Sequence, residues 1–178
     1  MKTVRIYTDG ACANNQSREN SAGWGTVLEF GDVRKELSGG ELNSSNNRME
    51  LSALLAGLRA LKQAPLHLEI FSDSSYLINC FRQGWYLGWQ KNGWKNSKKE
   101  PVENRDLWEG ILEGLAPHQA DFYLVKGHLS MKNLTDAAFD KLYREFLEKN
   151  HRDFTPEDYR HIIEMNNRCD ALAVAACK

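Results

Sequence analysis

The feature that most constrains the fold is a pair of strand-like stretches separated by only two residues. Residues 23–30 (GWGTVLEF) and 33–42 (VRKELSGGEL) are joined by Gly31-Asp32, which is typical of a tight hairpin turn. Before them, residues 3–11 (TVRIYTDGA) alternate apolar and polar side chains, as a half-buried strand does. The first 42 residues therefore predict three antiparallel strands.

After residue 42 the hydrophobic period changes from that of strands to that of helices. Residues 44–63 carry leucines on one helical face, with serine and asparagine in front and Pro65 beyond the end. The same reasoning predicts these later elements: a strand over 66–73, a helix over 74–84, a short helix and a basic loop from 85 to 100, a helix over 101–115 with Pro101 near its first turn, a strand over 120–128, and helices over 133–150 and 154–176. This order predicts an α/β fold with a five-stranded mixed sheet, three antiparallel strands and then two parallel, and helices on both faces.

Bulk properties narrow the class of protein. The length of 178 residues favours a single domain over 1–178, and the net charge of −1 excludes a uniformly basic nucleic-acid binder. A local basic patch stays possible, because residues 82–105 combine lysines with tryptophans. There is no long apolar run or signal segment, and the four cysteines show no zinc-like spacing. We expect a cytoplasmic protein that does not associate with membranes and is a monomer.

Three acidic residues occupy positions that a core normally rejects. Asp9 precedes Gly10 at the end of the first strand, Asp73 ends the fourth strand, and Glu50 lies in the first turn of the helix between them. A right-handed crossover would make the two strands parallel neighbours, and ligands gather at the carboxyl ends of such strands. Each acid alone is more simply a turn former, a cap or a partner of the helix dipole. Together they would repel one another without a cation, and an all-oxygen ligand set favours Mg²⁺ or Mn²⁺.

Two further residues are ambiguous from pattern alone. Asp170 lies in NNRCDALAVAA, and the simplest interpretation is an exposed helix residue paired with Arg168 or another cation. His128 follows an alternating stretch in LVKGH and reads most simply as a solvent-facing residue at a strand end. Neither position predicts chemistry without further information.

The motifs as a set resemble ribonuclease H of the type I family. The matching segments are YTDGAC, NNRMEL, FSDSSY, GWKNSKKEPVENRDLW, VKGH and NRCDALA, and they occur in the family's order over nearly the whole chain. The resemblance implies a ribonuclease H-like fold and an endoribonuclease that hydrolyses the RNA strand of RNA/DNA hybrids, leaving 5′-phosphate and 3′-hydroxyl ends. The partner would be an RNA/DNA hybrid.

The resemblance also implies the catalytic and metal-binding residues. Asp9, Glu50, Asp73 and Asp170 would bind two Mg²⁺ ions, with Mn²⁺ as a substitute, and Asp9 would contact both. Such ions activate a water molecule and stabilise the leaving oxygen. His128 matches a mobile histidine that assists proton transfer or product release, a role that suits a side chain that titrates near neutrality.

Candidate substrate contacts follow from the same resemblance. Amide and hydroxyl side chains can recognise a 2′-hydroxyl, and lysines neutralise phosphates without reading sequence. The alternative for Asn47 is a helix cap, and for Trp85, Trp89 and Trp94 it is packing in the core or at a hinge. The substrate-binding candidates are Asn15, Asn46, Asn47, Ser75, Trp85, Lys91, Lys95, Lys98 and Lys99.

The chain departs from the family mainly after His128. Asp170 follows that histidine by 42 residues, whereas family members usually need about ten. We interpret residues 129–165 as a helical insertion. The simplest explanation is an insertion that an exposed loop tolerates. Our hypothesis is that its apolar face packs on the body of the protein or on a partner and limits the movement of His128. Two alternatives to the hybrid-specific enzyme stay open: a metal-dependent nuclease of the same fold acting on DNA, and a non-catalytic hybrid-binding module.

Overall fold

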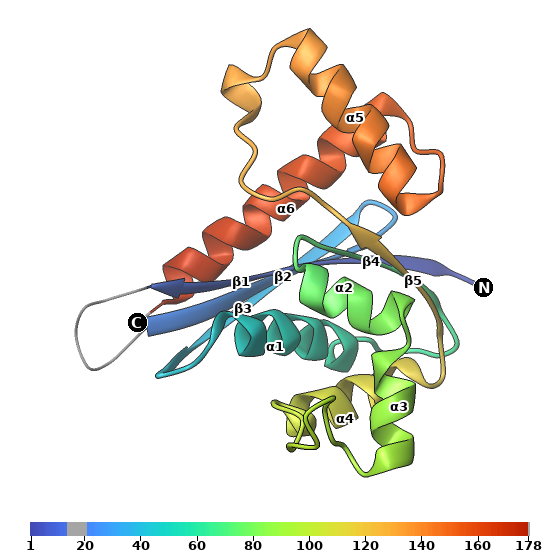
Figure 1. Ribbon diagram of the computed structural model, residues 1–178. Helices are drawn as coiled ribbons and strands as arrows, with labels where there is room; N and C mark the ends of the chain where they lie inside the picture. Colours follow the sequence, from blue (N-terminus) through green and yellow to red (C-terminus); the bar gives the residue numbers. More distant parts are fainter. Residues whose placement is uncertain (14–20, 178) are drawn as a thin grey trace.

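The computed structural model describes residues 1–13 and 21–177 of the chain (Figure 1). The elements are β1 (Thr3–Ala13), β2 (Ser21–Phe30), β3 (Val33–Leu42), α1 (Asn46–Arg59), β4 (His67–Ser72), α2 (Ser75–Arg82), α3 (Trp85–Asn92), α4 (Arg105–Leu115), β5 (Gln119–Leu124), the short 3-10 helix η1 (Met131–Asn133), α5 (Asp136–Asn150) and α6 (Pro156–Ala176). None of the helices in these two ranges is long and apolar enough to cross a membrane.

The five strands form one mixed sheet in the order β3-β2-β1-β4-β5. The pairs β1–β2 and β2–β3 are antiparallel, whereas β1–β4 and β4–β5 are parallel. Gly31 makes the predicted hairpin turn with a φ of 57°, a conformation that glycine adopts without strain. The predicted fold class is therefore confirmed, including the parallel neighbours β1 and β4.

Helices cover both faces of the sheet, as predicted (Figure 1). The helices α1 to α4 lie on one side, where Leu54, Leu68 and Trp108 belong to the first buried cluster. The helices α5 and α6 lie on the other side, where a second cluster includes Phe71 and Tyr159. Local sequence signals set where the helices begin. For example, Ser45 and Thr155 accept hydrogen bonds from Arg48 N and Asp158 N and cap α1 and α6.

Three glycines let α6 approach the sheet closely. A Cβ on Gly23 would overlap the carbonyl oxygen of Ala173, and one on Gly25 would overlap that of Cys169. Gly40 of β3 lies against Ala176 in the same way. The glycines of β2 and β3 therefore form the surface on which the C-terminal half of α6 rests, and this contact fixes the position of Asp170.

The segment 129–165 packs on the body of the protein. The ring of Phe146 from α5 stacks on Tyr159 of α6 at 4.6 Å, and Phe154 meets the rings of Phe71 and Tyr123 from the sheet. Asn150, the last residue of α5, exchanges hydrogen bonds with Leu124: its Oδ1 accepts from the Leu124 N–H at 2.8 Å, and its Nδ2 donates to the Leu124 carbonyl at 3.1 Å. The side chain thus occupies the place of a further strand at the edge of β5.

Three local predictions were wrong. The helix α4 begins at Arg105 after Asn104, so Pro101 lies outside it and forms an isolated bridge with Lys95. The fifth strand ends at Leu124 rather than at His128, because its parallel partner β4 ends at Ser72. Glu50 lies in the second turn of α1 rather than the first, since α1 begins at Asn46. At the start of α4, the left-handed turn at Asn104 outweighed the apolar pattern.

Candidate active site

Asp9 lies where the parallel part of the sheet ends. Pairing between β1 and β4 stops at Thr8 and Ser72, whereas β1 continues to Ala13 alongside β2. Asp9 is therefore not at the end of its strand, as expected from the sequence, but follows the last residue that is paired on both sides. Its side chain is buried, with 2% exposure, and its Oδ1 accepts a hydrogen bond from the Gly10 N–H at 2.9 Å.

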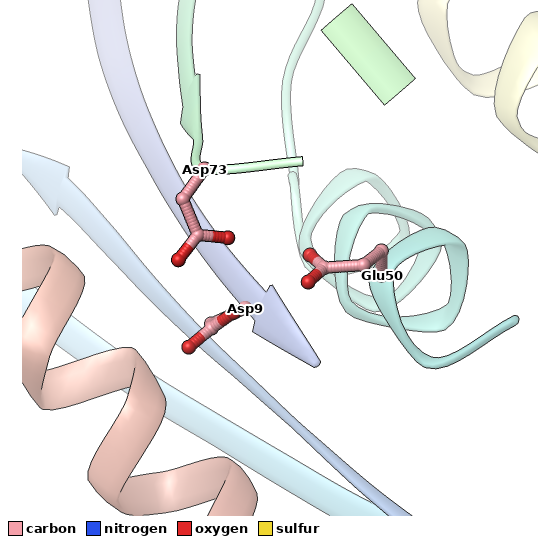
Figure 2. Close-up of side chains that lie close together, drawn as sticks. All are labelled: Asp9, Glu50 and Asp73. Carbon is pink, nitrogen blue, oxygen red and sulfur yellow. The ribbon is translucent and has the colours of Figure 1, made fainter. Parts of the chain in front are cut away.

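Asp73 and Glu50 reach the same point from β4 and α1. Asp73 directly follows β4, and Glu50 lies on the side of α1 that contacts β1. A Cβ on Gly10 would lie 2.7 Å from the Glu50 nitrogen, so only glycine allows α1 this close to the strand. Carboxylate oxygens of Asp9, Glu50 and Asp73 lie within 4.8 Å of one another, and Figure 2 shows the three side chains converging.

The three carboxylates are in an unfavourable electrostatic environment. Burial, and then the charges of Glu50 and Asp73, raise the pKa of Asp9 far above its ordinary value. Burial and the charge of Asp73 raise the pKa of Glu50 to about 8. Burial also raises the pKa of Asp73. Two buried oxygens, Asp9 Oδ2 and Glu50 Oε2, have no hydrogen-bond partner among the described residues.

This arrangement fits a divalent cation. A cation between the carboxylates would replace their mutual repulsion by attraction and would occupy the two unpartnered oxygens. Oxygen-only ligand sets suit hard cations such as Mg²⁺, Mn²⁺ and Ca²⁺ rather than zinc, which prefers nitrogen and sulfur ligands. The acidic cluster could therefore hold a metal ion.

Asp170 and His128 lie at the rim of the same site. His128 Nδ1 is 4.0 Å from Asp170 Oδ1, and the histidine side chain is 79% exposed. The alternative partner of Asp170 is occupied elsewhere, because the Arg168 guanidinium donates to both oxygens of Glu36 on β3. Arg168 is therefore not the partner of Asp170, and the side chain that could pair with Asp170 as another cation, when protonated, is His128.

An open cavity of about 900 Å³ contains all five of these residues. Its floor is acidic, and polar side chains from the first turns of α1 and α2 surround it. The lining also includes Asn46, Asn47, Ser75 and Tyr76. The cavity is thus wide, polar and open to solvent, as a site for a large charged substrate requires.

Three of the four amide and hydroxyl candidates lie in the part of the chain that the structure describes. Asn46, Asn47 and Ser75 line the cavity and are exposed. The cap of α1 is Ser45, so the alternative of a capping role for Asn47 was wrong. Asn15 lies outside the residues that the structure describes.

The basic and aromatic candidates lie on α3 and the loop that follows it. Trp85 is partly buried and its ring lies 6.3 Å from that of Tyr76, a residue of the cavity wall. Trp89 and Trp94 pack against each other, with ring centroids 6.0 Å apart, so the packing alternative holds for both. All four lysine candidates are exposed: Lys91, Lys95, Lys98 and Lys99.

Two residues of the site were missed by the sequence reasoning. Asn166 is buried on α6, and its side-chain hydrogen bond to Asp73 favours the charged form of that carboxylate and so opposes the rise in its pKa. It precedes Asp170 by four residues, so the helical repeat puts both on one face, a signal that was available in the sequence. Gly127 was noted only as part of VKGH, yet a Cβ there would overlap the Asp73 carboxylate.

Comparisons with a family model, with curated relatives and with solved structures all match this chain to ribonuclease H. The family model described as RNase H matches residues 1–147. The chain is 52% identical to a ribonuclease H of Moorella thermoacetica over 99% of its own length and 92% of the relative's. It is also 52% identical to a ribonuclease H of Symbiobacterium thermophilum, over 99% of its own length and 95% of the relative's. Among solved structures, it resembles LC9-RNase H1, a type 1 RNase H with the type 2 active-site motif, with a TM-score of 0.64 at 22% identity over 93% of this chain and 84% of the other.

Proposed function

This chain belongs to the RNase H family, whose members are hydrolases, and from that premise we propose that it is an endoribonuclease that cleaves the RNA strand of RNA/DNA hybrids. The observation that carries the proposal is the set of converging carboxylates, Asp9, Glu50 and Asp73, at the floor of an open polar cavity. A solved structure that resembles the chain, LC11-RNase H1, is in complex with an RNA/DNA hybrid, with a TM-score of 0.50.

We propose that the carboxylates of Asp9, Glu50, Asp73 and Asp170 hold two Mg²⁺ ions, for which Mn²⁺ can substitute. Such ions supply an activated water molecule and stabilise the charge on the leaving oxygen. The protein contributes a rigid floor, because Asp9 and Glu50 are buried on β1 and α1 and cannot move away from each other. Cleavage would leave 5′-phosphate and 3′-hydroxyl ends.

His128 is proposed as the residue that moves protons or releases product at the rim. Its exposed imidazole stands beside Asp170, where it can reach both solvent and the cavity. An imidazole can accept a proton on one ring nitrogen and donate one from the other, which suits a residue that transfers protons. It is expected to accelerate the reaction without being indispensable to it.

Recognition of the hybrid is proposed to come from two regions. Asn46, Asn47 and Ser75, together with Asn15, would contact the strand that carries 2′-hydroxyls, since amides and hydroxyls both donate and accept hydrogen bonds. Trp85 and the four exposed lysines Lys91, Lys95, Lys98 and Lys99 would hold the other strand, mainly through its phosphates.

We also propose the organisation and setting of the enzyme. Residues 1–178 form a single domain, in which residues 129–165 are a helical insertion between His128 and Asp170. The single domain is supported by the two apolar clusters, which lie on opposite faces of one sheet and both include residues of β1 and β4. Cys12, Cys80 and Cys169 are free thiols, which suits a reducing compartment such as the cytoplasm. The enzyme is proposed to act as a monomer.

Incubation with labelled substrates tests the proposal and its two alternatives. The protein is mixed with an RNA/DNA hybrid, duplex DNA or duplex RNA, with Mg²⁺ or with EDTA, and the products are separated by size. We expect Mg²⁺-dependent cleavage of only the RNA strand of the hybrid, with products that a ligase accepts as 5′-phosphates. Cleavage of DNA would support a DNA nuclease instead, and binding without cleavage would support a non-catalytic module.

A further inference from the structure

The segment that carries His128 has no regular structure of its own. We call residues 126–130 the histidine loop; it connects β5 with η1. His128 is in the left-handed region with a φ of 59°, a conformation that residues other than glycine rarely adopt. A loop residue stays in such a conformation only where its surroundings hold it there. The contacts of the two neighbouring residues, Gly127 and Leu129, therefore decide where the imidazole stands.

On its N-terminal side the histidine loop is held by β4. The Val125 N–H donates to the Ser72 carbonyl at 2.9 Å, which continues the parallel pairing by one residue. Gly127 then lies directly against the Asp73 carboxylate, with no room for a Cβ between them. This contact fixes the beginning of the loop relative to the acidic cluster.

On its C-terminal side the histidine loop is held by α6. Asn167 Nδ2 donates a hydrogen bond to the Leu129 carbonyl at 2.8 Å. Asn167 precedes Asp170 by three residues on the same helix, so the two side chains lie on neighbouring positions of one face. The helix that carries Asp170 thus also holds the residue next to His128. Leu129 is itself partly buried against the second apolar cluster.

We propose that Asn167 is a positioning residue that holds His128 beside Asp170. The proposal rests on the proposed function, because it gives Asn167 a role only through the histidine. With the Leu129 carbonyl anchored on one side and Gly127 seated on the other, the left-handed turn at His128 points its imidazole at the rim of the cavity. The long connection from His128 to Asp170 would otherwise leave the loop free to move away from α6.

A double-mutant cycle tests whether Asn167 acts through His128. Cleavage of the hybrid is measured for the wild type, Asn167→Ala, His128→Ala and the double variant, with kcat and KM determined separately. We expect Asn167→Ala to lower kcat about fivefold, the factor that corresponds to one ordinary hydrogen bond, with little change in KM. In the His128→Ala background the same substitution should have no further effect. Effects that multiply in the double variant would overturn the proposal.

Two controls separate positioning from a general loss of structure. Asn133→Ala removes an exposed amide three residues before the start of α5 and should leave kcat unchanged. Asn167→Leu keeps a side chain of similar volume but no donor, and it should behave like Asn167→Ala. If Asn167→Leu keeps the full kcat of the wild type, the hydrogen bond has no positioning role.

A measurement without substrate distinguishes failure of this inference from failure of the proposed function. Backbone ¹⁵N relaxation of His128 and Leu129 reports the rigidity of the histidine loop on the fast timescale. We expect order parameters typical of rigid backbone in the wild type and a clear drop in Asn167→Ala, with the rest of α6 unchanged. Unchanged order parameters would overturn the inference even if the enzyme is active. An inactive wild type with a rigid loop would refute only the proposed function.

Discussion

The backbone of Gly127 lies directly against the carboxylate of Asp73, although one residue follows β4 and the other follows β5. The contact exists because β4 and β5 are parallel neighbours that end at the same edge, at Ser72 and Leu124. It couples the loop that carries His128 to the floor of the acidic site. Adding a single methyl group to Gly127 should therefore displace the Asp73 carboxylate.

The first prediction concerns this contact. Gly127→Ala should push the Asp73 carboxylate away from Asp9 and Glu50 and lower kcat by about 10- to 100-fold, because misplaced catalytic groups reduce the rate steeply. The thermal unfolding midpoint should change by only a few degrees, since the loop is at the surface and can shift outward. Steady-state cleavage of the hybrid and thermal unfolding in EDTA measure the two effects. Full activity in Gly127→Ala would mean that the position of Asp73 is not critical.

The second prediction concerns the buried acid at the centre of the site. Asp9→Asn should lower cleavage by about 10³-fold or more, because it removes a charge from the proposed metal ligands. The fold should survive and become more stable in EDTA, since one of the three repelling carboxylates is gone. Calorimetry with and without Mg²⁺ checks this: Mg²⁺ should raise the unfolding midpoint of the wild type and leave that of the variant nearly unchanged. An equal shift in both would contradict the assignment of Asp9.

The third prediction is a pH dependence of stability without metal. The pKa of Glu50 is raised from an ordinary value of 4.5 to about 8, so between these values the folded protein binds more protons than the unfolded chain. The contribution of this group to the free energy of unfolding therefore falls as pH rises through that interval. In EDTA, Glu50→Gln should be about 1–3 kcal/mol more stable relative to the wild type at about pH 8 than at about pH 5.

Chemical denaturation of both proteins at the two pH values measures that difference. Saturating Mg²⁺ should abolish the loss of stability that the wild type shows between about pH 5 and about pH 8, because a bound cation stabilises the charged carboxylate. A stability difference between wild type and Glu50→Gln that stays constant with pH in EDTA would show that Glu50 is not forced toward its protonated form.

The fourth prediction concerns the exposed lysines of α3 and the loop that follows it. Replacing Lys91, Lys95, Lys98 and Lys99 together by alanine should weaken hybrid binding and reduce its salt dependence. Each lost phosphate contact lowers the slope of log Kd against log salt by about 0.7–0.9. Binding is measured by fluorescence anisotropy in the Asp9→Asn background, to prevent cleavage, and kcat in the wild-type background should stay the same. A slope that does not change would place the phosphate contacts elsewhere.

The fifth prediction concerns the edge of the sheet. Asn150→Ala removes the hydrogen bonds that its amide makes with Leu124, Phe146 and Arg82, and the partly buried backbone groups of Leu124 lose this partner. We expect a loss of about 2–4 kcal/mol in the free energy of unfolding. The exposed Asn133→Ala should cost much less, which makes it the matched control in denaturant unfolding. Equal stability of the two variants would mean that α5 contributes little to closing the edge of β5.

Much of the fold could be predicted from the sequence because its signals are local. The hairpin at Gly31-Asp32, the caps Ser45 and Thr155, and the apolar periods of α1 and α6 all depend on residues close together in the chain. The convergence of Asp9, Glu50 and Asp73 also followed, because a right-handed crossover between two strands leaves little choice of topology. The end of β5 could not be predicted in this way, since it depends on pairing with β4, which is distant in the sequence. The start of α4 depends on the left-handed turn at Asn104, which the apolar pattern does not indicate.

The sequence by itself determined which side chains are available for chemistry, the mixed sheet that carries them and the strand order that brings two aspartates together. Only the tertiary structure decided that Asp170, 42 residues beyond His128, returns to the same cavity. That placement depends on how closely α6 packs on Gly23 and Gly25 and on the anchoring of α5 at the edge of β5. Such contacts are set by shape and burial across the whole chain, and no local pattern of residues encodes them.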